Sequence, residues 1–288
     1  TSIPPHNLGD TIDAVLALMD DRDISIEALI GIIKGPDFPT GGIIMGTSGL
    51  RSGYLTGKGK VRVRARTDIE EHGEGRFRIV VTEIPYMVNK ARLIENIAEL
   101  IKDKRIEGIH DLRDESDREG LRVVIELKRD ANPQVILNQL FRYTQMEDTF
   151  SINLLALVNN QPKVLNLKEM LTHYLDFQQE VIVRRTRYDL RKAEERAHIL
   201  EGLRIALDYI DEVIAIIRAS KSIPEAKDGL MTRFGLTDIQ AQAIVDMRLG
   251  RLTGLERDKI EAEYAELMEK IADYKDILAN ESRVLQII

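Results

Sequence analysis

Two long stretches of this chain lack the residues that usually end a helix. Residues 167–218 contain no proline and only one glycine, Gly202, and residues 255–285 contain neither. In the second stretch apolar residues recur at alternating steps of four and three, the pattern of a coiled-coil seam: Ile260, Tyr264, Leu267, Ile271, Tyr274 and Leu278. The first stretch offers a matching set: Ala193, Ala197, Leu200, Leu203, Leu207, Ile210, Ile214 and Ile217. We therefore expect two long helices that pack together, the first reaching ~75 Å if unbroken.

The connection between these helices, residues 219–254, is too short to run back along the whole length of the first helix, as a parallel pair would require. The helices should therefore run antiparallel and carry a small lobe at their far end. Capping boxes predict the helix starts in this region: Ser222 with Glu225, Thr237 with Gln240, and Thr253 with Glu256. We also expect an apolar stripe on one short helix of the lobe: Ile239, Ala243, Ile244, Met247 and Leu249. A lobe of about 35 residues buries little by itself, so the stripe predicts a dimer contact, with the lobe's own core as the alternative.

The N-terminal half alternates between strand and helix patterns. Short amphipathic helices are expected at residues 8–19 and 26–33, the second capped by Ser25. Later the order is strand, helix, strand, strand, helix, strand, at residues 77–84, 91–104, 109–113, 121–127, 132–143 and 152–158. The predicted fold is α+β and multidomain: a mixed α/β platform (1–163), an outgoing coiled-coil helix (164–218), a small all-helical lobe (219–254) and a returning helix (255–288).

One run of cations contrasts with the net charge of −7. From Lys58 to Arg66 basic and apolar residues alternate, so on a strand the cations share one face. We expect this strand to pair with residues 77–84 and form a two-stranded ribbon whose unpaired cations bind DNA phosphates. The ribbon's cations are Lys58, Lys60, Arg62, Arg64, Arg66, Arg76 and Arg78. The alternative is an edge strand that its charges protect from aggregation, or one paired with Glu70, Glu71 and Glu74.

Composition disfavours several classes of function. The chain has no cysteine, and therefore no disulfide and no thiolate nucleophile or metal ligand. Its five histidines show no metal-ligand spacing. No apolar run approaches the roughly 18 residues of a membrane span. The chain opens on Thr1 and ends on an apolar run, so we expect it to be a piece of something longer.

Several segments carry a resemblance to a known family. They lie at residues 3–8 (IPPHNL), 35–40 (GPDFPT), 88–95 (VNKARLIE), 112–117 (LRDESD), 240–249 (QAQAIVDMRL) and 251–256 (RLTGLE). In this order, over essentially the whole chain, they resemble the A subunits of bacterial type IIA DNA topoisomerases. Residues 89–93, 184–186 and 246–256 are closer to the gyrase branch of that family than to the topoisomerase IV branch.

The resemblance implies a role for each part of the chain. The platform would be the tower that supports an arm of the bent gate DNA, and the lobe would be the C-gate, the dimer contact through which the transported duplex leaves. The implied partners are double-stranded DNA, a second copy of the chain and the gyrase B subunit in an A2B2 complex, without a membrane. The implied enzyme is an ATP-dependent isomerase of the bacterial cytoplasm, associated with the nucleoid. Its Mg²⁺ and ATP would be bound by the B subunit, with no cofactor in this chain.

The family's catalytic tyrosine follows an arginine in an Arg-Tyr-Thr motif that should lie upstream of residue 3. We therefore expect no catalytic or metal-binding residue in this chain, and no DNA cleavage by the chain alone. Arg142-Tyr143-Thr144 repeats the tripeptide far downstream, and we interpret Tyr143 as structural. Three alternatives stay open: a fragment of the A subunit of topoisomerase IV, a non-catalytic coiled-coil interaction protein, and a nuclease that uses Tyr143.

Overall fold

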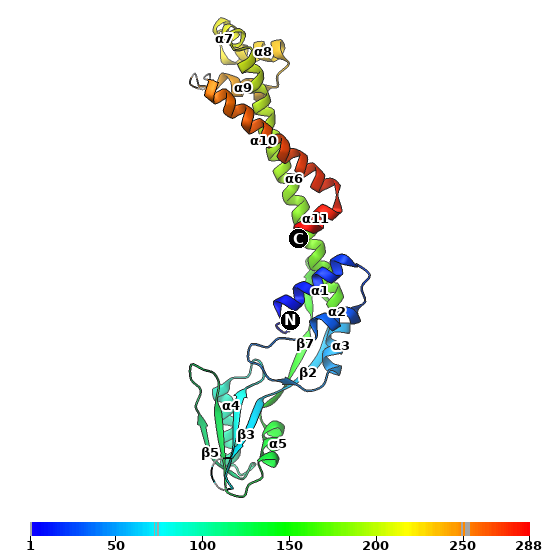
Figure 1. Cartoon of the computed structure of the whole chain (residues 1–288), viewed down its shortest axis with the longest axis vertical. Coiled ribbons are helices and arrows are strands. Elements are labelled where there is room, and N and C mark those ends of the chain that lie inside the picture. Colours follow the sequence, from blue (N-terminus) through cyan, green and yellow to red (C-terminus); the bar gives the residue numbers. More distant parts are fainter. Residues whose placement is uncertain (1, 72, 74, 249, 251–253) are drawn as a thin grey trace. The chain divides into compact units, whose positions relative to one another are not determined.

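The structure is a computed structural model that describes residues 2–71, 73, 75–248, 250 and 254–288. The chain divides into two compact units, Thr1–Leu175 and Asp176–Ile288. Helix α6 (Leu167–Asp208) contributes residues to both units (Figure 1). The α+β fold class is confirmed, whereas the four domain boundaries drawn from the sequence stay predictions.

The first unit contains two sheets and a hairpin, and every described strand pair in them is antiparallel. The first sheet has the order β1-β2-β7, with strands β1 (Ile43–Ile44), β2 (Lys58–Arg64) and β7 (Glu147–Asn153). The second sheet has the order β3-β4-β6-β5, with strands β3 (Arg66–Glu71), β4 (Phe77–Glu83), β5 (Ile109–Asp114) and β6 (Val123–Leu127). The hairpin consists of β8 (Leu155–Val158) and β9 (Gln161–Val164).

The predicted pairing of residues 58–66 with residues 77–84 is wrong. Strand β2 pairs along its whole length with β7, and the chain then changes sheets at Ala65, so that β3 begins at Arg66 and pairs with β4. The sequence hides this change because Ala65 is buried like Val61 and Val63, and the alternation continues across it. The last strand of the predicted order, residues 152–158, is divided: residues 152–153 end β7 of the first sheet, and residues 155–158 form β8 of the hairpin.

Helices α4 (Lys90–Lys102) and α5 (Pro133–Tyr143) pack against the second sheet. Asn89 and Asn132 cap them by accepting backbone N–H groups of the first turn. The buried apolar residues of both helices and of β4 and β6 form one core, which includes Ile79, Val81, Leu93, Ile97, Val123, Ile125, Leu137 and Leu140.

Three further helices belong to the first unit: α1 (Leu8–Asp20), α2 (Ile26–Ile33) and α3 (Ser48–Thr56). The first two were predicted, with Ser25 as the cap of α2. Helix α3 was not predicted, because its glycines suggest a loop. These glycines serve close packing instead: a Cβ at Gly49 would lie 1.8 Å from the carbonyl oxygen of Lys60, on β2.

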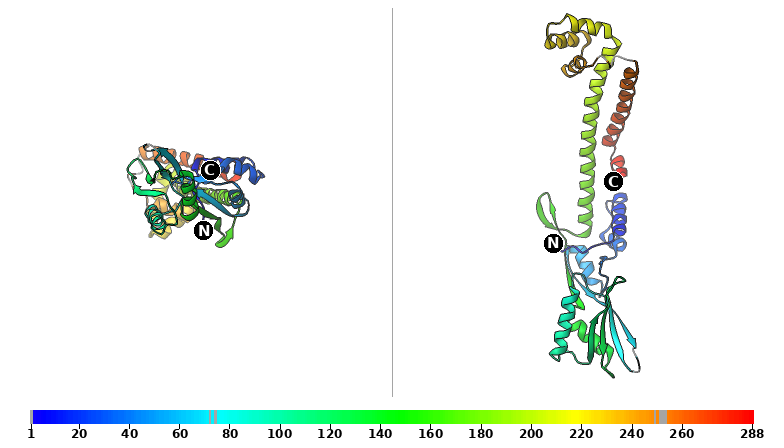
Figure 2. Two further views of the ribbon diagram at one scale, coloured as in Figure 1. Left: turned by 90° about the horizontal axis from the view of Figure 1, so that it is seen from below. Right: turned by 90° about the vertical axis from the view of Figure 1, so that its left-hand side faces the viewer.

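In the second unit, α10 (Gly254–Ala279) runs antiparallel to α6, as predicted (Figures 1 and 2). Ion pairs join Glu194 to Lys275 at 2.9 Å and Arg204 to Glu261 at 2.8 Å, so residue numbers rise on one helix as they fall on the other. The buried seam residues agree with the predicted pattern: Ala193, Ala197, Leu200, Leu203, Leu207, Ile260 and Ile271. Leu278 departs from it, because its neighbour Ile277 is the buried residue and packs against Ile182 and Val284.

Neither long helix is continuous. The first stretch breaks at Tyr209, between α6 and α7 (Ile210–Ala219), where φ is −120° and ψ is 38°. The returning stretch breaks at Asn280, before α11 (Glu281–Ile287). The last residues of the predicted first seam therefore lie on α7, and all three are half-buried: Ile210, Ile214 and Ile217.

The lobe contains α7, α8 (Ile223–Phe234) and α9 (Asp238–Val245). Thr237 and Gln240 form the predicted capping box of α9. Ser222 caps α8, but the Glu225 carboxylate accepts from the backbone of Lys221 and not from that of Ser222, so this box is incomplete. The third predicted box involves Thr253, which lies outside the described residues.

The predicted apolar stripe does not lie on one helix face. Helix α9 ends at Val245, so Met247 follows the helix. Ile239 is 61% exposed, whereas Ile244 is 2% exposed and belongs to the core of the lobe. Ala243 and Met247 are half-buried, and Leu249 lies outside the described residues. Of the described members, Ile239 is the one that presents its side chain outward.

The one glycine of α6, Gly202, lies where α9 approaches it. A Cβ at this position would be 2.7 Å from the Cβ of Gln240, which is buried. The Gln240 amide donates to the carbonyl oxygen of His198 at 2.7 Å, and its oxygen accepts from the backbone N–H of Thr237 at 3.0 Å. The missing side chain therefore lets one buried glutamine join the capping box of α9 to the backbone of α6.

We expect Gly202→Ala to destabilise the protein although alanine favours helices. The gain in helix propensity is about 1 kcal/mol, but the new methyl overlaps Gln240, and such overpacking costs about 1–3 kcal/mol. Urea denaturation followed by circular dichroism measures the net effect, with Glu201→Ala at the exposed neighbouring position as the control. A higher stability of Gly202→Ala would contradict this packing argument.

Candidate nucleic-acid interface

The predicted alternation along β2 is confirmed. Val61 and Val63 are each 2% exposed, whereas Lys58, Lys60 and Arg62 are exposed on the opposite face. β7 pairs with β2 along its whole length, whereas β1 pairs on the other side only with Val63 and Arg64. The interpretation as an edge strand is therefore wrong for the end of this run, whereas Lys58 to Arg62 pair with one strand among the described residues.

The arginines at the end of this run are paired, contrary to the expectation of unpaired cations. The Glu147 carboxylate on β7 pairs with both Arg62, at 3.5 Å, and Arg64, at 2.5 Å. The guanidinium of Arg64 also lies 4.4 Å from the centroid of the Phe141 ring. Arg66 pairs with Glu83 at 3.1 Å. Arg64 and Arg66 therefore hold strands and helices together, while Arg62 keeps most of its side chain exposed.

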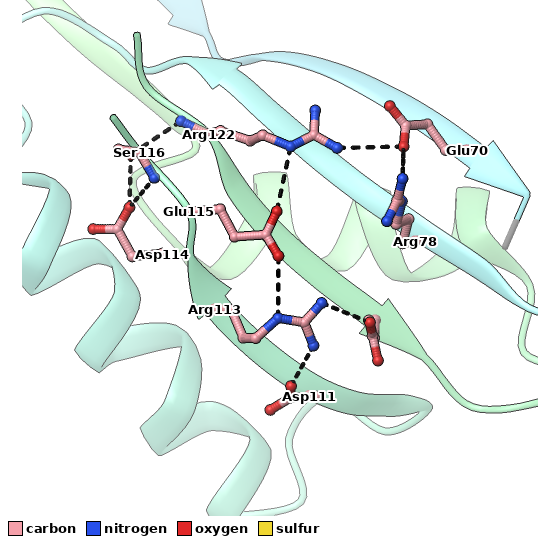
Figure 3. Close-up of polar contacts among 9 residues, drawn as sticks. Glu70, Arg78, Asp111, Arg113, Asp114, Glu115, Ser116 and Arg122 are labelled. Carbon is pink, nitrogen blue, oxygen red and sulfur yellow. Dashed lines mark hydrogen bonds and ion pairs between the residues drawn. The ribbon is translucent and has the colours of Figure 1, made fainter. Parts of the chain in front are cut away.

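Arg78 belongs to an ion-pair network on the outer face of the second sheet (Figure 3). The strand register places Glu70, Arg78, Glu126 and Asp111 in one row across β3, β4, β6 and β5. Arg78 contacts Glu70 at 2.6 Å, and Arg113 contacts Glu126 and Asp111, each at 2.7 Å. Opposite charges on neighbouring strands satisfy one another here.

Two further residues extend this network toward the turn between β5 and β6 (Figure 3). Arg122 contacts Glu70 at 3.5 Å and Glu115 at 3.4 Å. Glu115 also contacts Arg113, at 3.2 Å. Because Arg78, Arg113 and Arg122 all form ion pairs, this part of the sheet offers few free N–H donors to a phosphate.

The same contacts shift the pKa values of several groups toward their charged forms. The hydrogen bond that Arg78 donates lowers the pKa of Glu70, and the hydrogen bond that Arg113 donates to Glu126 raises the pKa of Arg113. Hydrogen bonds from Lys90 and then from Ser116 lower the pKa of Asp114 to about 2. Glu70 and Asp114 are thus ionised at neutral pH, when they accept these hydrogen bonds.

The structure separates the predicted phosphate-binding set. Lys58 and Lys60 lie together on β2, exposed and without an ion pair among the described residues. Arg76 precedes β4, at the opposite end of the β3–β4 ladder from Arg66. Six residues of extended strand span ~20 Å. Arg76 therefore cannot share one contact patch with Lys58 and Lys60 as a single ribbon would.

A second group of cations, which was not predicted, lies in the turns after α4 and after β6. They are separated along the sequence and follow no period that predicts a common face. Only the order of the strands brings these turns to the same end of the sheet. Arg76 lines a surface hollow with two of them, Lys128 and Arg129.

Tyr143 lies at the end of α5 and is 42% exposed. The guanidinium groups of Arg105 and Arg142 lie 5.3 and 5.5 Å from its ring centroid. Among the residues that the structure describes, no cluster of histidine and acidic side chains could hold a metal ion. Within the same residues, no helix is both long enough and apolar enough to span a membrane.

Comparisons with known proteins identify the family to which the chain belongs. The family model for the A subunits of DNA gyrase and topoisomerase IV matches residues 1–288, and the chain belongs to this family. It is 62% identical over its whole length to the DNA gyrase A subunit of Clostridium acetobutylicum, and it covers 35% of that relative. It is 63% identical to the corresponding gyrase chain of Halalkalibacterium halodurans, covering 34%, and 58% identical to that of Streptococcus pneumoniae, covering 35%. The chain thus spans about a third of these relatives.

Proposed function

We propose that this chain is the DNA-supporting and exit-gate part of a DNA gyrase A subunit. The observation that carries the proposal is the match of the family model to the whole chain. The names of the similar relatives support the gyrase branch over topoisomerase IV. The match also argues against a coiled-coil protein without a role in an enzyme.

In this proposal each unit has a mechanical task. The first unit supports one arm of the gate DNA, using Lys58, Lys60 and the exposed part of Arg62. These cations contact phosphates and read no sequence. The helix pair of the second unit holds the lobe, and two copies meet through their lobes to close the exit for the transported duplex.

The whole enzyme would be an ATP-dependent DNA isomerase in the bacterial cytoplasm, associated with the nucleoid. A second copy of this chain and the gyrase B subunit would complete an A2B2 complex. The B subunit would bind Mg²⁺ and ATP, and this chain would bind neither. The nucleophilic tyrosine would lie outside this chain, so the chain alone would not cleave DNA.

We expect the chain to bind duplex DNA with an affinity that falls steeply as salt rises. The change Lys58→Gln with Lys60→Gln should lower the slope of log K against log salt by about 2, since each phosphate contact contributes about 0.9. Fluorescence anisotropy measures the slope. The control is Arg118→Gln with Lys163→Gln, which removes equal charge from exposed positions elsewhere in the unit. Equal slopes for the two double variants would contradict the role of β2.

We expect the chain to form dimers through its lobe. Ile239→Asp should weaken the dimer at least about 100-fold, because burying an isoleucine in each copy contributes about 1.5–3 kcal/mol per side chain. Sedimentation equilibrium measures the dissociation constant. The control is Leu157→Asp, at a hairpin position that is 73% exposed. A chain that stays monomeric at all concentrations, or an unaffected Ile239→Asp dimer, would rule out this contact.

Tyr143 should have no part in DNA cleavage. Its ring packs against two guanidinium groups at the end of a helix, and this supports a structural role. Incubation of the chain with supercoiled DNA and Mg²⁺, followed by denaturation, should yield no protein-linked DNA, and Tyr143→Phe should behave identically. Protein-linked nicks that disappear in Tyr143→Phe would instead favour the nuclease alternative.

A further inference from the structure

A group of exposed cations gathers at one end of the second sheet. Its members come from the residue before β4, from the end of α4 and from the turns after α4 and β6: Arg76, Lys102, Lys104, Arg105, Lys128 and Arg129. The two turns lie side by side, because the backbone N–H of Lys128 donates to the carbonyl oxygen of Gly108 at 2.7 Å. We call this group the basic end of the sheet.

Shallow hollows connect the members of the basic end. Lys102, Lys104 and Lys128 line one hollow together. A second hollow shares Lys104 and adds Arg105, and a third shares Lys128 and adds Arg129. Arg76 also lines this third hollow. The cations therefore form one continuous surface.

These cations differ from the arginines of the sheet face in having no ion pair among the described residues. Carboxylates are present at this end, namely Glu71, Asp103, Glu107, Asp130 and Glu126, the last of which pairs with Arg113, but they are fewer than the cations. The opposite end of the sheet has the reverse balance. There the turn between β5 and β6 carries Arg118 among four carboxylates: Asp114, Glu115, Asp117 and Glu119.

We propose that the basic end of the sheet binds the phosphodiester backbone of duplex DNA, as a contact separate from the lysines of β2. The inference rests on the proposed function, in which this unit supports a duplex. A duplex presents one charge per ~1.7 Å of its axis and can engage several cations at once, which suits a surface of flexible, unpaired side chains. The ion-paired sheet face and the acidic opposite end are unfavourable to a polyanion, so the charge distribution selects this end.

The test removes the lysines that line one hollow, as Lys102→Gln, Lys104→Gln and Lys128→Gln in the whole chain. All three side chains are exposed, so the variant should fold, which circular dichroism verifies. Binding to a duplex of a few tens of base pairs is measured across about 50–200 mM salt. We expect the slope of log K against log salt to fall by about 2–3, with a similar loss for unrelated duplex sequences.

The matched control is Arg92→Gln, Arg118→Gln and Lys163→Gln, which removes the same charge from exposed positions away from the basic end. Equal effects of the two triple variants would overturn the inference, because net charge alone would then explain the loss. A normal slope for the lysine triple variant, together with weaker binding by the Lys58 and Lys60 variant, would overturn this inference and leave the proposed function standing. A wild-type chain that binds no duplex at low salt would overturn both.

A competitor identifies the kind of partner. Polyglutamate at equal charge concentration should displace the duplex weakly. If polyglutamate binds the wild-type chain more tightly than the duplex does, and the lysine triple variant loses that binding, the surface recognises an acidic protein segment and the DNA assignment is wrong.

Discussion

The second unit depends on one apolar face of helix α6. Ala193 and Ala197 on this face pack with Ile271 of α10, while Leu200 and Leu203 enter the core of the lobe. Small side chains let the partner helices approach closely. The closest approach is at Gly202, where Gln240 of α9 occupies the space that a side chain would need. Because Ile260 of α10 belongs to the same core as the lobe helices, the lobe and the helix pair share one core. A lobe of this size could bury little without it.

In the first unit, ion pairing between strands determines which cations stay available to a ligand. Arginines on strands form ion pairs with carboxylates on neighbouring strands, such as Arg64 with Glu147 and Arg78 with Glu70. The lysines of β2 and the cations of the turns have no such neighbour among the described residues. A chain with a net charge of −7 can therefore still present local cationic surfaces to a polyanion. Counting cations along a strand overestimates the interface, because the count ignores the strand beside it.

Elements with a strong local signal were predicted well. Ser25 and Thr237 cap the helices that follow them, and the coiled-coil seam matches from Ala193 to Leu207. The breaks at Tyr209 and Asn280 were missed, since neither residue is a glycine or a proline. Helix α3 was missed for the opposite reason. Its glycines are typical of a loop, and the strands that pack closely against them, which explain the glycines, are visible only in the structure.

The family, the α+β class and the antiparallel helix pair follow from the amino-acid sequence alone, because they depend on periodicity and on motifs that are local along the chain. Which cations are free to bind a ligand depends on the folded chain. The switch of sheets at Ala65 separated Arg76 from the lysines of β2, and the strand order brought Lys104 beside Lys128. Pairing between strands that are distant in sequence produces no periodic pattern in the sequence. Ala65, for example, would be buried in either sheet, so its position in the alternation does not indicate the change of sheets. Electrostatic surfaces follow from that pairing and so could be located only in the folded chain.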